Sequence, residues 1–312
     1  MAEQATQQIT VEATPERCFE VVTDFERYPE WAPDVKEAKV VERDAEGRPL
    51  EVEFRAAAMG RSTRYQLRYD LSGAPSHLSW SLTHGDITYD EAIRVNAEAT
   101  GLLMQHCRKA KAILVMSTHS VYMPQDDPLH VFLETDPIGD CHAQSTPTYS
   151  VSKISQEAVA RTCARAFDVP TIICRMNAAY TPWAGLPAMH AAAVVEGRTV
   201  VTRWDPCPYS LIHQDDINRQ TEALLDAAAV PAPIVNWAGD DWASVQEYCA
   251  FVGELVGREA KVEVQYPPNT LRGSIASNER RIALTGPCEV PWREGMRRNV
   301  AERWPDLVGA AG

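Results

Sequence analysis

The chain has 312 residues, 45% of them hydrophobic and 23% charged, and its 43 acidic and 30 basic side chains give a formal net charge of −13. It is long enough for two domains or one large one, and no stretch approaches the ~18 apolar residues of a membrane span. The acidic balance is the wrong sign for a surface that neutralises nucleic-acid phosphates. We therefore expect no nucleic-acid partner and no membrane insertion.

The first residues, MAEQATQQ, are polar and lack the basic and apolar regions of a secretory signal, so we expect a cytoplasmic protein. The eight cysteines form no C-x-x-C pair, and the eight histidines show no H-x-x-H or H-x-x-x-H spacing. Zinc sites normally use such closely spaced pairs. We predict no metal ion and reduced, mostly buried thiols.

Residues 1–87 are predicted to form an antiparallel α+β unit. Thr14 can cap a helix that has Pro15 at its first position, and apolar residues recur on one face of that helix. Further along, alternating apolar side chains such as those of YQLRY (65–69) indicate half-buried strands. We expect one strand, then the helix, then four strands.

From about Tyr89 the pattern changes to helices that alternate with short apolar runs, which is typical of a parallel sheet with crossover helices. We expect helices over 89–108 and 149–167 and strands at AILVM (112–116), TIICR (171–175) and PIVNW (233–237). In the first of these helices, one face would consist of Ile93, Asn96, Thr100, Leu103 and Cys107. The sequence therefore predicts an α/β domain over residues 88–312.

One pair of side chains has a spacing with chemical use. Tyr149 and Lys153 lie four residues apart in TYSVSK, so a helix places them on one face, a single turn apart. A neighbouring ammonium favours the charged form of a phenol, which lowers its pKa from about 10 toward neutrality and suits it to general acid/base catalysis. Thr118, in VMSTHSVY (115–122), supplies a hydroxyl directly after a buried strand.

Together these motifs resemble the extended short-chain dehydrogenases/reductases, the NAD-dependent epimerase/dehydratase group. The resemblance runs from about residue 89 to 309 and includes ICRMNAAYTP (173–182), YSLIHQDDI (209–217), IVNWAG (234–239) and VPWREGMRR (290–298). It implies a Rossmann-like parallel sheet, NAD or NADP as cofactor, and a small-molecule substrate with a hydroxyl or carbonyl group. It also implies a homodimer formed through the helices at 89–108 and 149–167.

The resemblance assigns roles to the matching residues. Tyr149 would be the acid/base, Lys153 would hold the nicotinamide ribose and lower the Tyr149 pKa, and Thr118 would hydrogen-bond the reacting oxygen. Asn96 would be either a supporting helix residue near the cofactor or a buried amide whose hydrogen bonds are all made within the protein. Asn177 would approach the nicotinamide, with Ala178 and Tyr180 nearby. The predicted catalytic residues are Thr118, Tyr149 and Lys153, and the predicted cofactor-binding residues are Asn96, Tyr149, Lys153 and Asn177.

Other polar residues near these motifs are interpreted as structural. His213, Asp215 and Asp216 are expected to order a loop and cap the next helix rather than to touch substrate. His119, beside Thr118, is interpreted as incidental.

The stretch DFERYPEWAP (24–33) follows the capped helix and precedes the strands, and it resembles the polyketide cyclase and START-like superfamily. In that family a bent sheet wraps a long helix around a cavity for a hydrophobic ligand. Residues 1–87 contain no counterpart of the closing strands and gripping helix, so we expect a partial helix-grip head, either without a gripping helix or with the helix at 89–108 as its partial substitute. Its aromatic residues are either a small core or the lining of a ligand cavity, and the residues in question are Tyr28, Trp31, Tyr65, Tyr69 and Trp80.

A glycine-rich turn that holds the cofactor pyrophosphate is expected in the dehydrogenase family and is missing from this sequence. The glycines before Thr118 are at least a dozen residues apart, so G-x-G-x-x-G cannot form; they are Gly47, Gly60, Gly73, Gly85 and Gly101. We interpret the chain as a fusion, near GDITYD (85–90), of a partial head with a dehydrogenase that lacks its first strands. In the family's strand order, this loss leaves AILVM at a sheet edge.

Three functions are compatible with the sequence. The first is an NAD(P)-dependent epimerase, dehydratase or reductase with impaired cofactor binding. The second is a non-catalytic protein that binds a hydrophobic ligand in its START-like head. The third is an inactive fusion.

Overall fold

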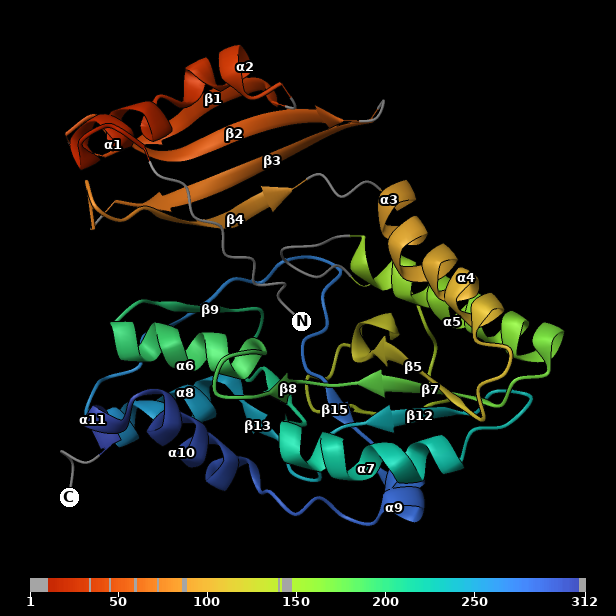
Figure 1. The fold of residues 1–312 in the computed structure, drawn as a ribbon. Coiled ribbons are helices and arrows are strands. Elements are labelled where there is room, and N and C mark those ends of the chain that lie inside the picture. The colour runs from red at the N-terminus through yellow and green to blue at the C-terminus, as the bar shows by residue number, and fades with distance from the viewer. Residues whose placement is uncertain are drawn as a thin grey trace. The chain divides into compact units, whose positions relative to one another are not determined.

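The computed structural model describes residues 11–33, 35–44, 46–58, 61–71, 73–85, 89–139, 141 and 148–308. The chain consists of two compact units, Met1–Ile87 and Thr88–Gly312 (Figure 1). The strand expected before Thr14 would lie mostly in residues 1–10, outside the described residues. No helix in the described ranges is long and apolar enough to cross a membrane.

The first unit is a four-stranded antiparallel sheet with short helices packed on it. The strands pair in chain order and are β1 (Val35–Arg43), β2 (Pro49–Ala58), β3 (Arg61–Asp70) and β4 (Ser79–Gly85). The helices are α1 (Pro15–Thr23), a 3₁₀ turn (Phe25–Arg27) and α2 (Tyr28–Trp31). Helix α1 begins as predicted, because the Thr14 hydroxyl accepts a hydrogen bond from the Arg17 amide at 3.3 Å. The predicted antiparallel α+β head is confirmed.

Aromatic side chains form the core of this unit. Phe25 is buried, and its ring centroid lies 4.4 Å from that of Tyr69 and 6.0 Å from that of Phe54. The side chains of Trp31 and Trp80 are instead 54% and 60% exposed. Trp80 lies in β4, where alternation gives the face of a side chain but not whether that face is covered, and Trp31 ends the short helix α2. Neither tryptophan is a core residue.

The second unit is built on a parallel sheet of three strands in the order β12-β7-β5. They are β5 (Ile113–Thr118), β7 (Thr171–Met176) and β12 (Ile234–Trp237), and a long crossover helix, α5 (Tyr149–Phe167), joins the first two. Strand β5 pairs only with β7 among the described residues, so it is the edge strand that the family's order implies. The predicted Rossmann-like parallel sheet with crossover helices is confirmed.

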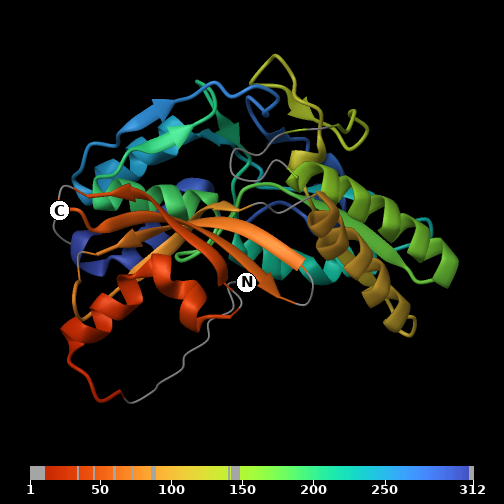
Figure 2. The ribbon, with the colours of Figure 1, turned by 90° about the horizontal axis from the view of Figure 1, so that it is seen from above.

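Helices cover both faces of this sheet. Ile173 of β7 packs with Ala160 and Ala164 of α5 on one face, whereas its neighbour Ile172 packs with Leu224 of α7 (Gln214–Asp226) on the other. Figures 1 and 2 both show α4 and α5 side by side. Because strand residues alternate between faces, a strand buried on both faces reads as a continuous apolar run.

The helix next to α5 differs from the prediction in one respect. It comprises α3 (Tyr89–Ile93), a π-helical turn (Arg94–Glu98) and α4 (Ala99–His106). Met104 is buried and Leu103 is 65% exposed, so the predicted position of Leu103 on the inward face is wrong. In the π-helical turn the Ala99 amide bonds to the Arg94 carbonyl, and this wider turn moves the inward face along by about one residue.

A buried ion pair ties α5 to the sheet. Glu157 and Arg175 are 1% and 3% exposed, and the Glu157 carboxylate accepts hydrogen bonds from Arg175 Nε at 2.9 Å and Nη2 at 2.8 Å. The same carboxylate accepts a bond from the Ser117 hydroxyl at 2.6 Å. The pair therefore links the helix to both β5 and β7.

The remaining elements extend the unit beyond the three-stranded sheet. The helices are α6 (Leu186–Glu196), α8 (Val245–Val256), α9 (Glu279–Thr285), α10 (Trp292–Arg303) and α11 (Pro305–Val308). Three short strand pairs are parallel: β8 (Ala179–Tyr180) with β11 (Ile212–His213), β9 (Val200–Thr202) with β14 (Val262–Val264), and β6 (Val131–Phe132) with β15 (Ile275–Ala276). One pair is antiparallel, β10 (Pro208–Tyr209) with β13 (Ala243–Ser244).

Candidate active site

The carboxyl ends of β5 and β7 meet a cavity of about 650 Å³ in the second unit. Thr118, Tyr149 and Asn177 line it, each from a different element or its end. Ligands of open α/β sheets typically bind outside the carboxyl ends of the strands, in clefts of this size. Three of the five residues that the sequence singles out therefore lie together at a candidate active site.

Thr118 and Tyr149 are held by the ends of their elements. Thr118 is the last residue of β5, and its hydroxyl accepts a hydrogen bond from the Ser120 amide at 3.2 Å in the turn that follows. Tyr149 is the first residue of α5. Burial raises the pKa of the Tyr149 phenol above its ordinary value of 10, and the interaction with the Thr118 hydroxyl offsets part of that rise. The phenol is therefore protonated at neutral pH.

Lys153 lies one turn further along α5 and is buried, and it does not line the cavity. Its ammonium donates a hydrogen bond to the Met116 carbonyl of β5 at 2.7 Å. Burial lowers the Lys153 pKa to about 8, although the nearby Glu157 carboxylate works against this. The expected lowering of the Tyr149 pKa by Lys153 is wrong for this structure, because burial of the phenol dominates and the ammonium is bound to the strand.

The two asparagines have different surroundings. Asn96 does not line the cavity; its amide donates to the Ser152 hydroxyl at 2.9 Å and so connects the π-helical turn to α5. Asn177 lines the cavity, and its amide nitrogen donates to the Ser274 carbonyl at 2.7 Å. Asn177 also accepts a bond from the Ala178 amide at 2.8 Å, which fixes the chain as it leaves β7.

Several residues of the cavity wall were not found from the sequence. His119, interpreted from the sequence as incidental, is buried, lines the cavity and shares a hydrogen bond with the Ser274 hydroxyl at 3.2 Å. His190, Thr202, Arg203 and Tyr209 also line the cavity. His190, Thr202 and Arg203 lie outside the family motifs. Tyr209 begins the motif YSLIHQDDI (209–217), but that resemblance assigned it no role, so no sequence signal pointed to any of the four.

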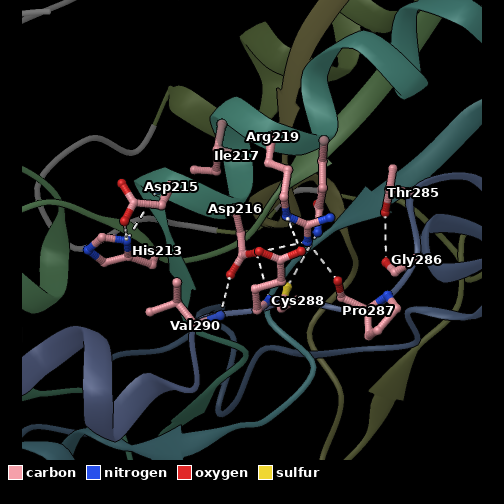
Figure 3. Close-up of polar contacts among 12 residues, drawn as sticks. His213, Asp215, Asp216, Ile217, Arg219, Thr285, Gly286, Pro287, Cys288 and Val290 are labelled. Carbon is pink, nitrogen blue, oxygen red and sulfur yellow. Dashed lines mark hydrogen bonds and ion pairs between the residues drawn. The ribbon is translucent and has the colours of Figure 1, made fainter.

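The polar residues at the end of β11 and in the first turn of α7 are structural, as expected (Figure 3). His213 caps α7, because its Nδ1 atom accepts a hydrogen bond from the Asp215 amide at 3.2 Å. The buried Asp216 carboxylate accepts bonds from the amides of Glu289 at 2.8 Å and Val290 at 3.0 Å. Asp216 therefore fastens the segment before α10 and does not line the cavity.

Tyr180 is likewise a core residue rather than part of the cavity wall. Its buried phenol donates a hydrogen bond to the Trp292 carbonyl at 3.3 Å.

The described residues fit the nicotinamide end of an NAD cofactor better than its pyrophosphate. Thr118, Tyr149 and Asn177 surround space for a reacting group. The described glycines that precede Thr118 form no phosphate cradle: Gly47 has φ +83° in the turn between β1 and β2, and Gly101 packs where an added Cβ would lie 2.9 Å from Val159. Within the described residues we find no group of three or more metal-ligating side chains.

Replacing Lys153 with methionine is expected to remove a pH dependence of stability. The folded-state pKa of about 8 lies below the ordinary 10.5, so between these values the unfolded chain binds a proton that the folded chain has released. The free energy of unfolding of the wild type should therefore rise with pH, relative to the variant, by about 3 kcal/mol over this window. Denaturant unfolding from pH 7.5 to 10.5 measures the difference, and parallel curves for the two proteins would contradict it.

Comparison with known proteins finds two family models, whose matches overlap over residues 81–112. Residues 2–112 match the family described as polyketide cyclase / dehydrase and lipid transport, and residues 81–192 match the NAD-binding family described as male sterility protein. No curated protein sequence matches the chain.

Solved structures of NAD complexes resemble this chain in fold. MoeE5 in complex with UDP-glucose and NAD shares 21% identity and a TM-score of 0.59, over 70% of this chain and 74% of that one. UDP-glucuronic acid 4-epimerase from Bacillus cereus, in complex with UDP-glucuronic acid and NAD, shares 18% identity and a TM-score of 0.57, over 68% of each chain. UDP-glucose 4-epimerase from Thermus thermophilus, in complex with NAD, shares 22% identity and a TM-score of 0.55, over 68% of this chain and 69% of that one.

At these identities the similarity establishes the fold and leaves the substrate open. The chain therefore joins a segment that resembles the polyketide cyclase family to the Rossmann-like fold of NAD-dependent epimerases and dehydratases.

Proposed function

We propose that this protein catalyses an NAD(P)-dependent epimerase, dehydratase or reductase reaction at a hydroxyl or carbonyl group of a small molecule, with weakened cofactor binding. The observation that carries the proposal is the meeting of Thr118 and Tyr149 at the carboxyl end of β5, beside a cavity of about 650 Å³. Two hydroxyl groups in this position can hydrogen-bond one substrate oxygen.

The proton chemistry follows from the state of the phenol. Because burial keeps Tyr149 protonated at neutral pH, the phenol would donate its proton to a carbonyl oxygen, and Thr118 would hold that oxygen by a hydrogen bond. The reverse reaction would begin from the phenolate form of Tyr149, whose oxygen would take a proton from the substrate hydroxyl group. A bound nicotinamide cofactor would supply the hydride chemistry.

The weak point of the site is the cofactor pyrophosphate. In this fold a helix N-terminus and a glycine-rich turn normally provide backbone hydrogen bonds and a favourable dipole for the phosphates. The described residues of the second unit supply no equivalent turn. The loss of these contacts lowers affinity without removing Thr118 or Tyr149.

Calorimetric titration of the full chain with NADH and NADPH tests the proposal. We expect binding with a Kd above about 1 µM, which corresponds to about −8 kcal/mol. A Kd well below that value would show that the pyrophosphate has an unrecognised site. No heat at millimolar cofactor would contradict the proposed function itself.

A second candidate function concerns the first unit, whose match to a lipid-transport family favours binding of a hydrophobic ligand. A chain that ignores NADH and NADPH but binds a fluorescent fatty acid would favour this function. A chain that binds neither would be the inactive fusion.

A further inference from the structure

The cavity wall formed by α6 and the end of β9 offers positive charge and hydrogen-bond donors. Among the described residues that line the cavity, Arg203 is the one permanently charged side chain, and no carboxylate is present. The chain as a whole carries a net charge of −13. A cationic lining in so acidic a protein indicates a ligand of the opposite charge.

Arg203 has no counter-ion among the described residues. Its partly buried guanidinium donates a hydrogen bond to the Tyr209 phenol, and no described carboxylate forms an ion pair with it. Tyr209 does not neutralise the charge, because burial raises the pKa of its phenol despite the neighbouring guanidinium. Charges removed from water are normally paired, so an unpaired guanidinium facing a cavity is suited to an anionic ligand.

Thr202, which precedes Arg203, adds a second group. Its side chain is buried and borders the cavity, and its hydroxyl has no hydrogen-bond partner among the described residues. Buried hydroxyl groups without a partner are uncommon in folded proteins. A ligand oxygen in this part of the cavity would satisfy it.

His190 of α6 adds a third group, and its contacts fix which nitrogen carries the proton. Burial lowers the His190 pKa to about 4, so the ring is neutral, and its Nδ1 atom lies 2.5 Å from the Tyr248 hydroxyl. That hydroxyl is buried, stays protonated and has no other partner among the described residues, so it donates to Nδ1. The His190 proton is therefore on Nε2, where it is available to a ligand acceptor.

We infer that Arg203, Thr202 and His190 bind an oxyanion of the substrate, a carboxylate or a phosphate, while Thr118 and Tyr149 act on its hydroxyl or carbonyl group. The second half of this statement rests on the proposed function; the anion site itself does not. The substrate class is then a small hydroxy or keto compound that carries an acidic group.

Calorimetric titration of the full chain with sodium pyrophosphate and with malonate, at constant ionic strength in chloride buffer, tests the anion site. We expect at least one of the two anions to bind the wild type. Binding of pyrophosphate alone would identify the acidic group of the substrate as a phosphate, and binding of malonate alone would identify it as a carboxylate. Arg203→Gln should weaken binding at least tenfold. Arg203→Lys should weaken it less, because lysine keeps the charge but loses the planar fork of donors.

The matched control is Arg198→Gln, which makes the same charge change in the turn between α6 and β9. Arg198 is exposed, paired with Glu196, and outside the cavity lining, so this variant should keep wild-type affinity. Circular dichroism shows whether each variant is folded, and Arg203→Lys provides a milder change if Arg203→Gln is not. Anion binding that is absent from the wild type, or equal in wild type and both Arg203 variants, would overturn the inference. Because these titrations contain no cofactor, their failure is distinct from a failure to bind NADH.

Discussion

Replacing Tyr149 with phenylalanine is expected to lower kcat by ~10²–10⁴, because the variant keeps the ring and loses the proton that a general acid/base supplies. The assay uses NADH with a panel of aldehydes and ketones, and NAD with UDP-glucose, which a similar structure binds. KM should change little, because phenylalanine fills the same part of the cavity wall.

Tyr266→Phe is the matched control for this experiment. Tyr266 is 61% exposed and does not line the cavity, so the same loss of a hydroxyl there should leave kcat unchanged. An unchanged kcat in Tyr149→Phe would remove Tyr149 from the catalytic assignment.

Replacing Glu157 with glutamine is expected to lower the free energy of unfolding by about 3–5 kcal/mol. The amide has nearly the shape of the carboxylate but leaves the buried Arg175 guanidinium without a counter-charge. Denaturant unfolding of the variant measures the loss. A loss below about 1 kcal/mol, the usual size for an exposed pair, would mean that water reaches the guanidinium.

Two further variants separate charge from packing. Replacing Glu157 with leucine and Arg175 with methionine together removes both charges and should recover much of the lost stability, because apolar pairs often replace a buried ion pair at little cost. Glu247→Gln breaks the exposed pair with Arg293 and should cost less than about 1 kcal/mol.

The elements that the sequence predicted best depend on local patterns. Helix α5 spans Tyr149–Phe167 as expected, and the three strands of the parallel sheet begin and end within two residues of the predicted apolar runs. Thr118 was found because it directly follows a predicted strand, and Tyr149 because it lies four residues before Lys153. Helical and strand periodicity is a property of neighbouring residues, so one sequence is enough to detect it.

What the sequence did not predict depends on contacts between distant segments. The spacing of Lys153 from Tyr149 placed the two residues one turn apart, but burial determines the direction of both pKa shifts, and the Lys153 ammonium bonds to the Met116 carbonyl. Arg203 and His190 gave no signal, because their partners Tyr209 and Tyr248 identify them only after the chain has folded.

No strand among the described residues pairs with the second side of β5, and this makes the sheet open to extension by protein engineering. A new parallel strand could pair with that side of β5 without any change in β7 or β12. The hydrogen bonds of the pairs β5–β7 and β7–β12 use other backbone groups than those that the new strand would use. Such a strand ends on the same side of the sheet as Thr118, since parallel strands share a carboxyl edge. A donor segment of strand, glycine-rich turn and helix, inserted before Tyr89, would therefore deliver its phosphate-binding turn to the same edge as the candidate active site.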